Sequence, residues 1–425
     1  MEFYANVAVN ACPLWDKSSR GKPDIARIAT WNTNPKESFG MRFTTHPLWL
    51  VGFRPFFTLA CLAGMTLPIL WALIFGGMLA APEAPFTAVQ WHAHEMFFGF
   101  GWAVLGGFLL TSTKNWVNIR GYHGPALMLL AAAWIAERIG MSIGGNWPAP
   151  LFVLTNNLFL GSIVTMLLWT LIRHRQNDSY RDNLIFLVML PGFLFAKYLM
   201  LHGDSFSGYN MAIGLFRMAF LVMLERTLTP FMKAGFQVAI LRQPKLDMAI
   251  KLLGLLLVVE FALPAPLVAA TAFTLAALLL VRFAFWKPHL AMRRIDIGIM
   301  YVGYLAIVGQ LLVEGFGHVT QYVWVGSVSV HLFTFGAMGC IIPAMIIRIA
   351  KGHTGRKVAF DVLDRAVLYI MLLALLIRVF LPQFFPGAYL LWIQISAVCW
   401  LTCFGILGWR YIPALWQPRI DGKDH

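Results

Sequence analysis

The sequence predicts an all-α polytopic membrane protein with about twelve transmembrane helices and both termini in the cytoplasm. Of the 425 residues, 59% are hydrophobic and only 12% are charged, whereas about a quarter of the residues of soluble domains are charged. Apolar runs of about 20 residues recur along the chain, which is the length that a hydrocarbon core of about 30 Å requires. Among the loops between these runs, Lys and Arg occur only in alternate ones. Together these observations predict a helical bundle that crosses a bilayer many times.

Each expected span is an apolar run that lies between polar residues or Gly and Pro breaks. The break between the seventh and eighth spans is the shortest, because only Leu263-Pro264-Ala265-Pro266 divides one long apolar stretch. In chain order the spans are residues 56–79, 90–113, 124–143, 150–172, 183–201, 209–232, 247–263, 265–286, 297–316, 324–350, 362–381 and 388–409.

The distribution of basic residues predicts the orientation, since cytoplasmic loops retain Lys and Arg. The loops around Pro82, Gly145, Gly203, Pro264, Thr320 and Pro386 contain neither residue. The intervening loops contain Lys114, Arg120, Arg173, Arg175, Arg181, Lys233, Arg242, Lys245, Lys287, Arg293, Arg294, Lys351, Arg356 and Lys357. The formal net charge of +14 is therefore a topology signal, and we expect no nucleic-acid partner. The expected partner of the spans is the lipid bilayer.

The predicted organisation is one transmembrane domain between two tails. Residues 1–45 are polar, mixed in charge and without the apolar stretch of a secretory signal, so we expect a poorly ordered cytoplasmic tail. Residues 46–412 form the twelve-helix domain, and residues 413–425 form a cytoplasmic C-terminal tail.

The five cysteines include no CxxC pair, which excludes a disulfide framework and a zinc ribbon. Gly352-His353-Thr354-Gly355-Arg356 lacks the Lys-Ser/Thr ending of a P-loop and follows a membrane helix, which excludes nucleotide binding.

Ionisable residues inside spans are costly and indicate function by default. Here they gather toward the non-cytoplasmic face. The second span enters from that face with Trp91-His92-Ala93-His94-Glu95-Met96, and His331 lies about 10 Å into the tenth span. The other members of the group are His202, His318, Glu137, Arg138, Lys197, Arg217, Glu260, Glu314 and Arg378.

Histidine at this depth favours a metal site, because neutral imidazole binds haem iron and copper and a hydrocarbon surrounding controls solvent access. We predict His92, His94 and His331 as ligands, with His202 and His318 as further candidates on the same side. Arg138 and Arg217 are candidates to pair with haem propionates, and Glu95, Glu137 and Glu260 to carry protons. The alternative for each histidine is a helix-to-helix hydrogen bond, or an aqueous-interface position for His202 and His318. No CxxCH is present, so a haem would be haem b, held without covalent attachment.

Helix geometry limits how the two histidines of the second span act together. Positions i and i+2 of a regular helix point about 200° apart, so His92 and His94 serve different centres, or one of them supports the other, unless the helix is unwound. Glu95 is expected on the face of His92. His94 and His331 share the pattern His-x3-Phe-Gly, which hints at two related ligand-bearing helices.

Motifs along most of the chain resemble a known family. In order they are His46-Pro47-Leu48-Trp49 with Phe53-Arg54-Pro55-Phe56-Phe57, Trp91-His92-Ala93-His94-Glu95-Met96 running to Gly107-Phe108-Leu109-Leu110-Thr111, His331 with Gly336-Ala337 and Arg348, and Gly352-His353-Thr354-Gly355-Arg356. Together they resemble the NnrS family of bacterial haem- and copper-containing membrane proteins.

The resemblance implies a twelve-helix protein of the bacterial inner membrane that is linked to nitric oxide, nitrosative stress and denitrification, with haem and, less firmly, copper. It carries over to His92, His94, Glu95 and His331, and Arg138 is similar to the family's arginine on the third helix. The chain departs from the family where Leu224-Glu225-Arg226 replaces a Gly-Gly-Arg run. It departs again where Tyr301 replaces a histidine before Tyr304, which leaves the metal stoichiometry open.

Two classes of function fit these residues. In the first, a metalloprotein binds or processes nitric oxide or a related small molecule, either as an oxidoreductase supplied with electrons by a quinone or donor protein or as a sensor or sequestering protein. In the second, a proton-coupled secondary transporter uses the intramembrane Glu, Arg and His residues. The two halves of the chain show no convincing similarity, which argues against the transporter.

Overall fold

The computed structural model describes residues 44–82, 86–320 and 322–423, and every regular element in these residues is helical. The predicted N-terminal tail, residues 1–45, lies outside the described residues except for its last two. The remainder belongs to one unit, Thr44–His425. The all-α class predicted from the sequence is confirmed.

The first part of the unit contains the helices that correspond to the first five predicted spans. α3 begins at a capping box, in which the Thr87 side chain accepts from Gln90 and the Gln90 side chain accepts from Thr87. Pro125 begins α5 at the position where a missing N–H costs nothing. The elements are α2 (Phe53–Phe75), α3 (Ala88–His94), the π-helical η2 (Glu95–Gly101), α4 (Trp102–Trp116), α5 (Pro125–Ile143), α6 (Ala149–Arg173) and α7 (Leu184–His202).

The remaining predicted spans follow in the same order. They are α8 (Ser205–Phe236), α9 (Pro244–Leu256) continued by the 3₁₀ segment η6 (Leu257–Ala262), α10 (Ala265–Phe285), α12 (Ile295–Val319), α13 (Val328–His331) continued by the π-helical η7 (Leu332–Met338) and α14 (Gly339–His353), α15 (Val362–Leu375) continued by the π-helical η8 (Leu376–Phe380) and α16 (Leu381–Phe384), and α17 (Tyr389–Leu415). The tenth helix begins at Val328, four residues later than expected, so His331 lies closer to the helix start than predicted.

Ten helical runs in the described residues are long and apolar enough to cross a membrane. α8 and the pair α9 and η6 are not among these ten. They occupy the places of the sixth and seventh predicted spans. α8 carries Arg217, Glu225, Arg226 and Lys233 along its length. α9 gives way to η6 at Leu257, and the chain is kinked at Val259 inside η6. We call the end of the helices with the basic loops the basic end, and the other the opposite end.

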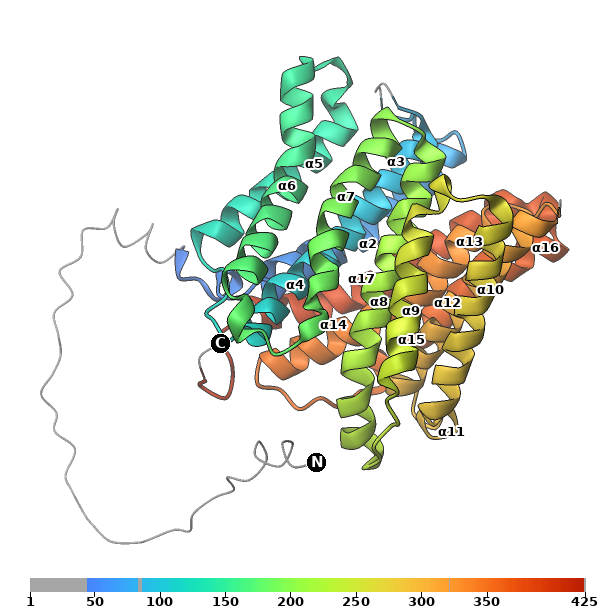
Figure 1. Ribbon diagram of the computed structural model, residues 1–425. Helices are drawn as coiled ribbons and strands as arrows, with labels where there is room; N and C mark the ends of the chain where they lie inside the picture. The colour runs from blue at the N-terminus through green and yellow to red at the C-terminus, as the bar shows by residue number, and fades with distance from the viewer. Residues whose placement is uncertain (1–43, 83–85, 321, 424–425) are drawn as a thin grey trace, which may run out of the picture. The chain divides into compact units, whose positions relative to one another are not determined.

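The packing brings together helices that are far apart in sequence. α2 packs along α17, and α10 packs along α12. The neighbouring pairs α5 with α6 and α7 with α8 also run side by side (Figure 1). Small residues allow the close approaches: a Cβ on Gly64 would lie 2.6 Å from the Phe404 ring of α17, and one on Gly336 would lie 2.3 Å from Cβ of Ala306 on α12.

Two stretches of the chain repeat the same order of elements at a fixed separation. η2 (Glu95–Gly101) and η7 (Leu332–Met338) are both π-helical and seven residues long, and they begin 237 residues apart (332 − 95). The helices that follow them, α4 and α14, also begin 237 residues apart (339 − 102), and so do α5 and α15 (362 − 125). The shared His-x3-Phe-Gly pattern is thus part of a longer structural correspondence between a stretch in the first half of the chain and one in the second half.

The predicted C-terminal tail is partly structured. α17 continues to Leu415, three residues into residues 413–425. The segment that follows packs on the start of α2, where Arg54 Nη1 donates to the carbonyl oxygens of Leu415 and Gln417, at 2.7 Å each. This contact ties the C-terminal segment to the first membrane helix.

The two departures from the family pattern have structural partners at the basic end. Glu225 of α8 is 3% exposed and pairs with Lys251 of α9 at 3.1 Å. The Tyr301 hydroxyl donates to the carbonyl oxygen of Trp286, and the Tyr304 hydroxyl donates to that of Leu279. These residues therefore join helices to one another.

Candidate functional site

A cluster of five ionisable side chains lies between α3, η2, α5 and α7. His94, Glu95, Glu137 and Lys197 are each 1% exposed or less, and the Arg138 side chain is 12% exposed. Arg138 pairs through Nε with Glu95 at 3.0 Å and through Nη2 with Glu137 at 3.1 Å, and Lys197 donates to Glu137 and to the carbonyl oxygen of Asn156. Two carboxylates thus face two cations, which is how buried charges are tolerated. We call this group the His94 cluster.

Both ring nitrogens of His94 face carboxylates. Nδ1 lies 3.1 Å from Glu95 Oε1, and Nε2 lies 3.3 Å from Glu137 Oε1. The imidazole therefore bridges two helices through their acidic residues. A metal at Nε2 would compete with Lys197 and Arg138 for the same Glu137 carboxylate.

Regular helix geometry predicts Glu95 on the face of His92. In the structure Glu95 instead contacts His94 and Arg138. The π-helical turn that begins at Glu95 is the physical reason. A π-helix bonds i to i+5 and is wider than an α-helix, so angular positions counted at 100° per residue do not hold across it.

The second cluster surrounds His331 at the start of the tenth helix. Nδ1 of His331 lies 2.8 Å from the carbonyl oxygen of Ser327, and Nε2 lies 3.2 Å from Nη2 of Arg378. Arg378 in the π-helical η8 also donates to the Tyr389 hydroxyl at 3.2 Å. Because the carbonyl oxygen can only accept, Nδ1 carries the hydrogen, and the lone pair of Nε2 accepts from Arg378.

His92 belongs to this second cluster and not to that of His94. Its ring stacks on Trp71 of α2, with 4.2 Å between centroids and 12° between planes. The charge of Arg378 acts on both His92 and His331. We call His92, His331, Arg378, Tyr389 and Trp71 the His331 cluster. The two histidines of the second span thus serve different clusters, which is one of the alternatives that the i, i+2 spacing allowed.

Both clusters sit at π-helical turns. η2 begins directly after His94 and η7 directly after His331, while η8 contains Arg378. Such turns are rare and are found mostly at functional sites. Their presence at both histidines supports a function for this end of the protein beyond helix packing.

A third group lies between α8, η6 and α12, also toward the opposite end. Arg217 is 1% exposed, and its Nη1 donates to Gln310 at 2.8 Å and to Glu314 at 3.0 Å. Glu260 of η6 lies close to the Glu314 carboxyl. Arg217 and Glu260 therefore lie in the same group, and this group contains neither His94 nor His331.

His202 and His318 are exposed side chains near the ends of α7 and α12. The His202 ring packs on Tyr198 at 5.6 Å. The structure does not join either histidine to the two clusters, and their ligand role remains a prediction. No group of three or more His, Cys, Asp and Glu in metal-binding geometry occurs among residues 44–82, 86–320 and 322–423.

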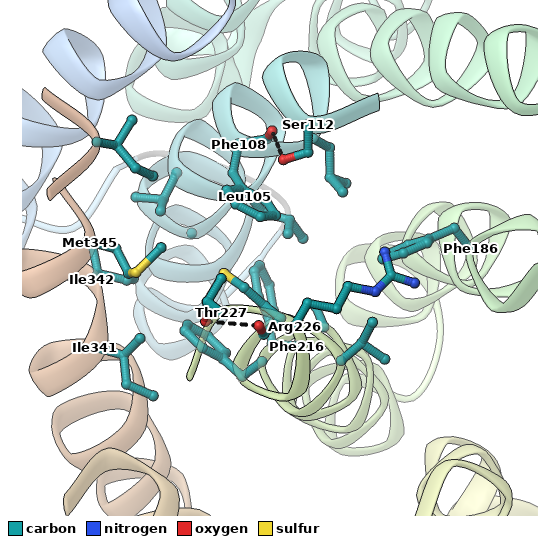
Figure 2. Close-up of a pocket in the computed structure, with 18 of the residues that line it drawn as sticks. Leu105, Phe108, Ser112, Phe186, Phe216, Arg226, Thr227, Ile341, Ile342 and Met345 are labelled. Carbon is teal, nitrogen blue, oxygen red and sulfur yellow. Dashed lines mark hydrogen bonds between the residues drawn. The ribbon is translucent and has the colours of Figure 1, made fainter. Parts of the chain in front are cut away.

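An apolar cavity of about 260 Å³ lies between α4, α7, α8 and α14. Leu105 and Phe108 face Ile342 and Met345 across it, and Arg226 extends toward Phe186 at its side (Figure 2). The last residues of the two π-helical turns, Gly101 and Met338, also line the cavity. No histidine of the described chain lines it, so it is separate from both clusters.

Comparison with known protein families identifies the family of the chain. The model of the family described as NnrS protein matches residues 47–419. The chain belongs to the NnrS family. Comparison with curated proteins gives no match. As a member of the NnrS family, the chain is a membrane protein associated with nitric oxide stress.

Sequence reasoning passed over several side chains that complete the clusters. Trp71 and Tyr389 come from α2 and α17, the first and last membrane helices, and aromatic residues are common in both. Lys197 was recognised as an intramembrane charge but given no role, although it is the cation nearest Glu137. The signal that could have assigned it is charge balance, because two buried carboxylates need two buried cations.

The close approach of Gly99 to Arg138 gives a testable expectation. A Cβ on Gly99 would lie 2.6 Å from Arg138 Nη1, so Gly99→Ala should push Arg138 away from Glu95 and Glu137 and lower the free energy of unfolding by about 1–3 kcal/mol. Denaturation of the purified protein in detergent measures this loss. Gly161→Ala, where the added Cβ has no atom within 4 Å, is the matched control and should be within about 0.5 kcal/mol of the parent. Equal stability of the two variants would contradict the arrangement.

Proposed function

We propose that this NnrS protein binds haem b through the His331 cluster and uses it to bind nitric oxide in the cytoplasmic membrane of a bacterium. The observation that carries the proposal is the orientation of His331. Its Nδ1–H is held by the carbonyl oxygen of Ser327, an arrangement typical of metal-ligating histidines because it fixes the tautomer and presents Nε2. The only partner that the structure gives Nε2 is a cation, Arg378, which a metal can replace as acceptor of the lone pair.

The other members of the cluster fit the same group. Arg378 carries a charge that complements a haem propionate. His92 lies close enough to Arg378 for that charge to act on it. The face of its ring stacks on Trp71, which fixes the ring plane. Neither ring nitrogen has a carboxylate partner among the contacts described above. His92 is therefore the candidate second ligand, to the haem or to a copper ion beside it. Arg138 and Arg217 are already paired with carboxylates, which makes them weaker candidates for propionates than Arg378.

Reduced haem iron supplies the chemistry of nitric oxide binding, and the chain supplies its surroundings. Nitric oxide is small and apolar, and the cavity that ends at Gly101 and Met338 offers it an apolar space inside the bundle. If the protein also processes nitric oxide, protons must reach the site. Glu95 and Glu137 are buried carboxylates on the second and third spans, and Glu260 lies in the group around Arg217. Electrons would come from a quinone or a donor protein.

The metal content of the purified chain tests this proposal. We expect a Soret band, its shift on reduction with dithionite, and about one iron per chain when the protein is expressed with adequate haem supply. Copper measured on the same sample decides whether His92 holds a second metal. A preparation without a Soret band and without iron would overturn the proposal and would favour a role that depends on the intramembrane charges alone.

A further inference from the structure

A group of basic side chains meets at the basic end, around the Gly352-His353-Thr354-Gly355-Arg356 motif that neither the fold nor the proposed function explains. Three membrane helices and the C-terminal segment contribute. The members, which we call the basic cluster, are Arg54 in the first turn of α2, Lys114 in the last turn of α4, His353 at the end of α14, and Arg356 and Arg419 in the segments that follow α14 and α17. Their positive charges act on one another.

The basic cluster is held in place by the backbone. Arg419 donates through Nη1 to the carbonyl oxygen of His353 at 3.1 Å, and the amide of Ile420 donates to the carbonyl oxygen of Thr354 at 3.1 Å. Gly355 has a φ of +80°, and a Cβ there would lie 2.8 Å from Cγ of Asp421. The motif therefore serves as a turn on which the C-terminal segment lies.

Positive charge exceeds negative charge in this cluster. Within the part of the chain that the structure describes, no carboxylate pairs with Lys114 or Arg356, and Asp421 pairs with Arg419 at 2.6 Å. Its hydrogen bond from Arg419 lowers the pKa of Asp421 to about 2, so this carboxylate is charged at neutral pH. One negative charge thus faces Lys114, Arg356 and Arg419.

The excess charge is not simply dispersed into water, because Nη1 of Arg356 is buried and has no hydrogen-bond partner among the described residues. A buried donor without a partner costs about 1–3 kcal/mol, and more when it is charged. A tetrahedral anion with several acceptor oxygens is the chemistry that satisfies such donors, because guanidinium groups bind phosphate oxygens with matched geometry.

We propose that the basic cluster binds a phosphate group, specifically the phosphodiester headgroup of an anionic phospholipid in the leaflet at the basic end. The cations come from the ends of membrane helices, which is the depth of lipid headgroups. Trp416, which is 46% exposed and donates to the Thr58 hydroxyl, places an indole at the same level, as is typical of the membrane interface. Basic pockets between membrane helices on this side bind anionic headgroups. The inference is independent of haem, because the His331 cluster lies at the opposite end.

The test is thermal unfolding of the full chain, delipidated in detergent, with added phosphatidylglycerol, phosphatidylcholine or inorganic phosphate. We expect a saturable rise in the unfolding temperature with phosphatidylglycerol and none with phosphatidylcholine. A similar rise with inorganic phosphate would identify free phosphate as sufficient and would overturn the lipid assignment. No rise with either anion would overturn the site.

Charge variants locate the effect. Arg356→Gln should weaken the apparent affinity for phosphatidylglycerol about fivefold, since a basic side chain near a headgroup contributes about 1 kcal/mol. Asp421→Asn removes the opposing carboxylate and should strengthen the affinity, a gain that a misfolded variant would not show. Arg175→Gln changes an exposed arginine of another basic-end loop and is the matched control. Equal affinities for the parent, Arg356→Gln and Asp421→Asn would place the lipid elsewhere and overturn the proposal.

Discussion

Replacing His331 by Ala is expected to remove haem from the purified protein, with the haem-to-chain ratio falling at least tenfold. His331 is the histidine whose Nδ1 is anchored by a backbone carbonyl oxygen and whose Nε2 has a lone pair to offer, and loss of an axial nitrogen removes the strongest bond between the chain and the iron. The measurement is the Soret absorbance together with iron per chain. Added imidazole should restore part of the band, because it replaces the missing ligand without repairing any other defect.

Matched controls separate ligation from general damage. His123→Ala and His289→Ala change exposed histidines of the basic-end loops and should keep the haem ratio of the parent. His94→Ala should also keep it, since His94 is held between Glu95 and Glu137. An unchanged spectrum in His331→Ala, or a spectrum lost only in His94→Ala, would move the site to the His94 cluster.

Replacing Glu137 by Gln is expected to lower the free energy of unfolding by about 3–5 kcal/mol. Glu137 is 0% exposed and is the shared partner of His94, Arg138 and Lys197. The uncharged amide would leave two buried cations opposite one carboxylate, Glu95. Unfolding of the purified protein in mixed detergent micelles, followed by the helical circular dichroism signal, measures the loss.

The double variant Glu137→Gln with Lys197→Met tests whether charge balance is the cause. Removing Lys197 as well leaves one cation opposite one carboxylate, and at least half of the lost stability should return. Asp204→Asn, a change at the exposed cap of α8, should have no measurable effect because asparagine caps helices as well as aspartate does. A double variant less stable than Glu137→Gln would show that Lys197 contributes through packing and not through its charge.

The membrane helices were predictable because their signal is local. An apolar run of about 20 residues specifies a spanning helix whatever its neighbours are, and α10 begins at the predicted Ala265 and ends one residue before the predicted Trp286. The Leu263-Pro264-Ala265-Pro266 break correctly separated the helical stretch of α9 and η6 from α10, although α9 and η6 are not among the ten helices of the described chain that are long and apolar enough to cross a membrane. The position of each ionisable residue along its predicted span was enough to predict that these residues gather toward one end.

The composition of each cluster was not predictable, because it depends on which helices pack together and on local helix geometry. His92 and Glu95 were expected on one face and lie in different clusters, since the π-helical turn at Glu95 changes the angle between successive side chains. Trp71 and Tyr389 reach the His331 cluster only because α2 packs along α17. The basic cluster likewise requires the C-terminal segment to return to the start of α2.

Titration of nitric oxide into the reduced protein, with the visible spectrum and the nitric oxide concentration followed together, tests the central claim most directly. Binding at a haem held by His331 predicts a saturable change of the Soret band that reaches its limit at one nitric oxide per haem and is absent in His331→Ala. Steady consumption after saturation would add turnover to binding. A spectrum that does not change on addition of nitric oxide to the haem-loaded, reduced protein would contradict the account.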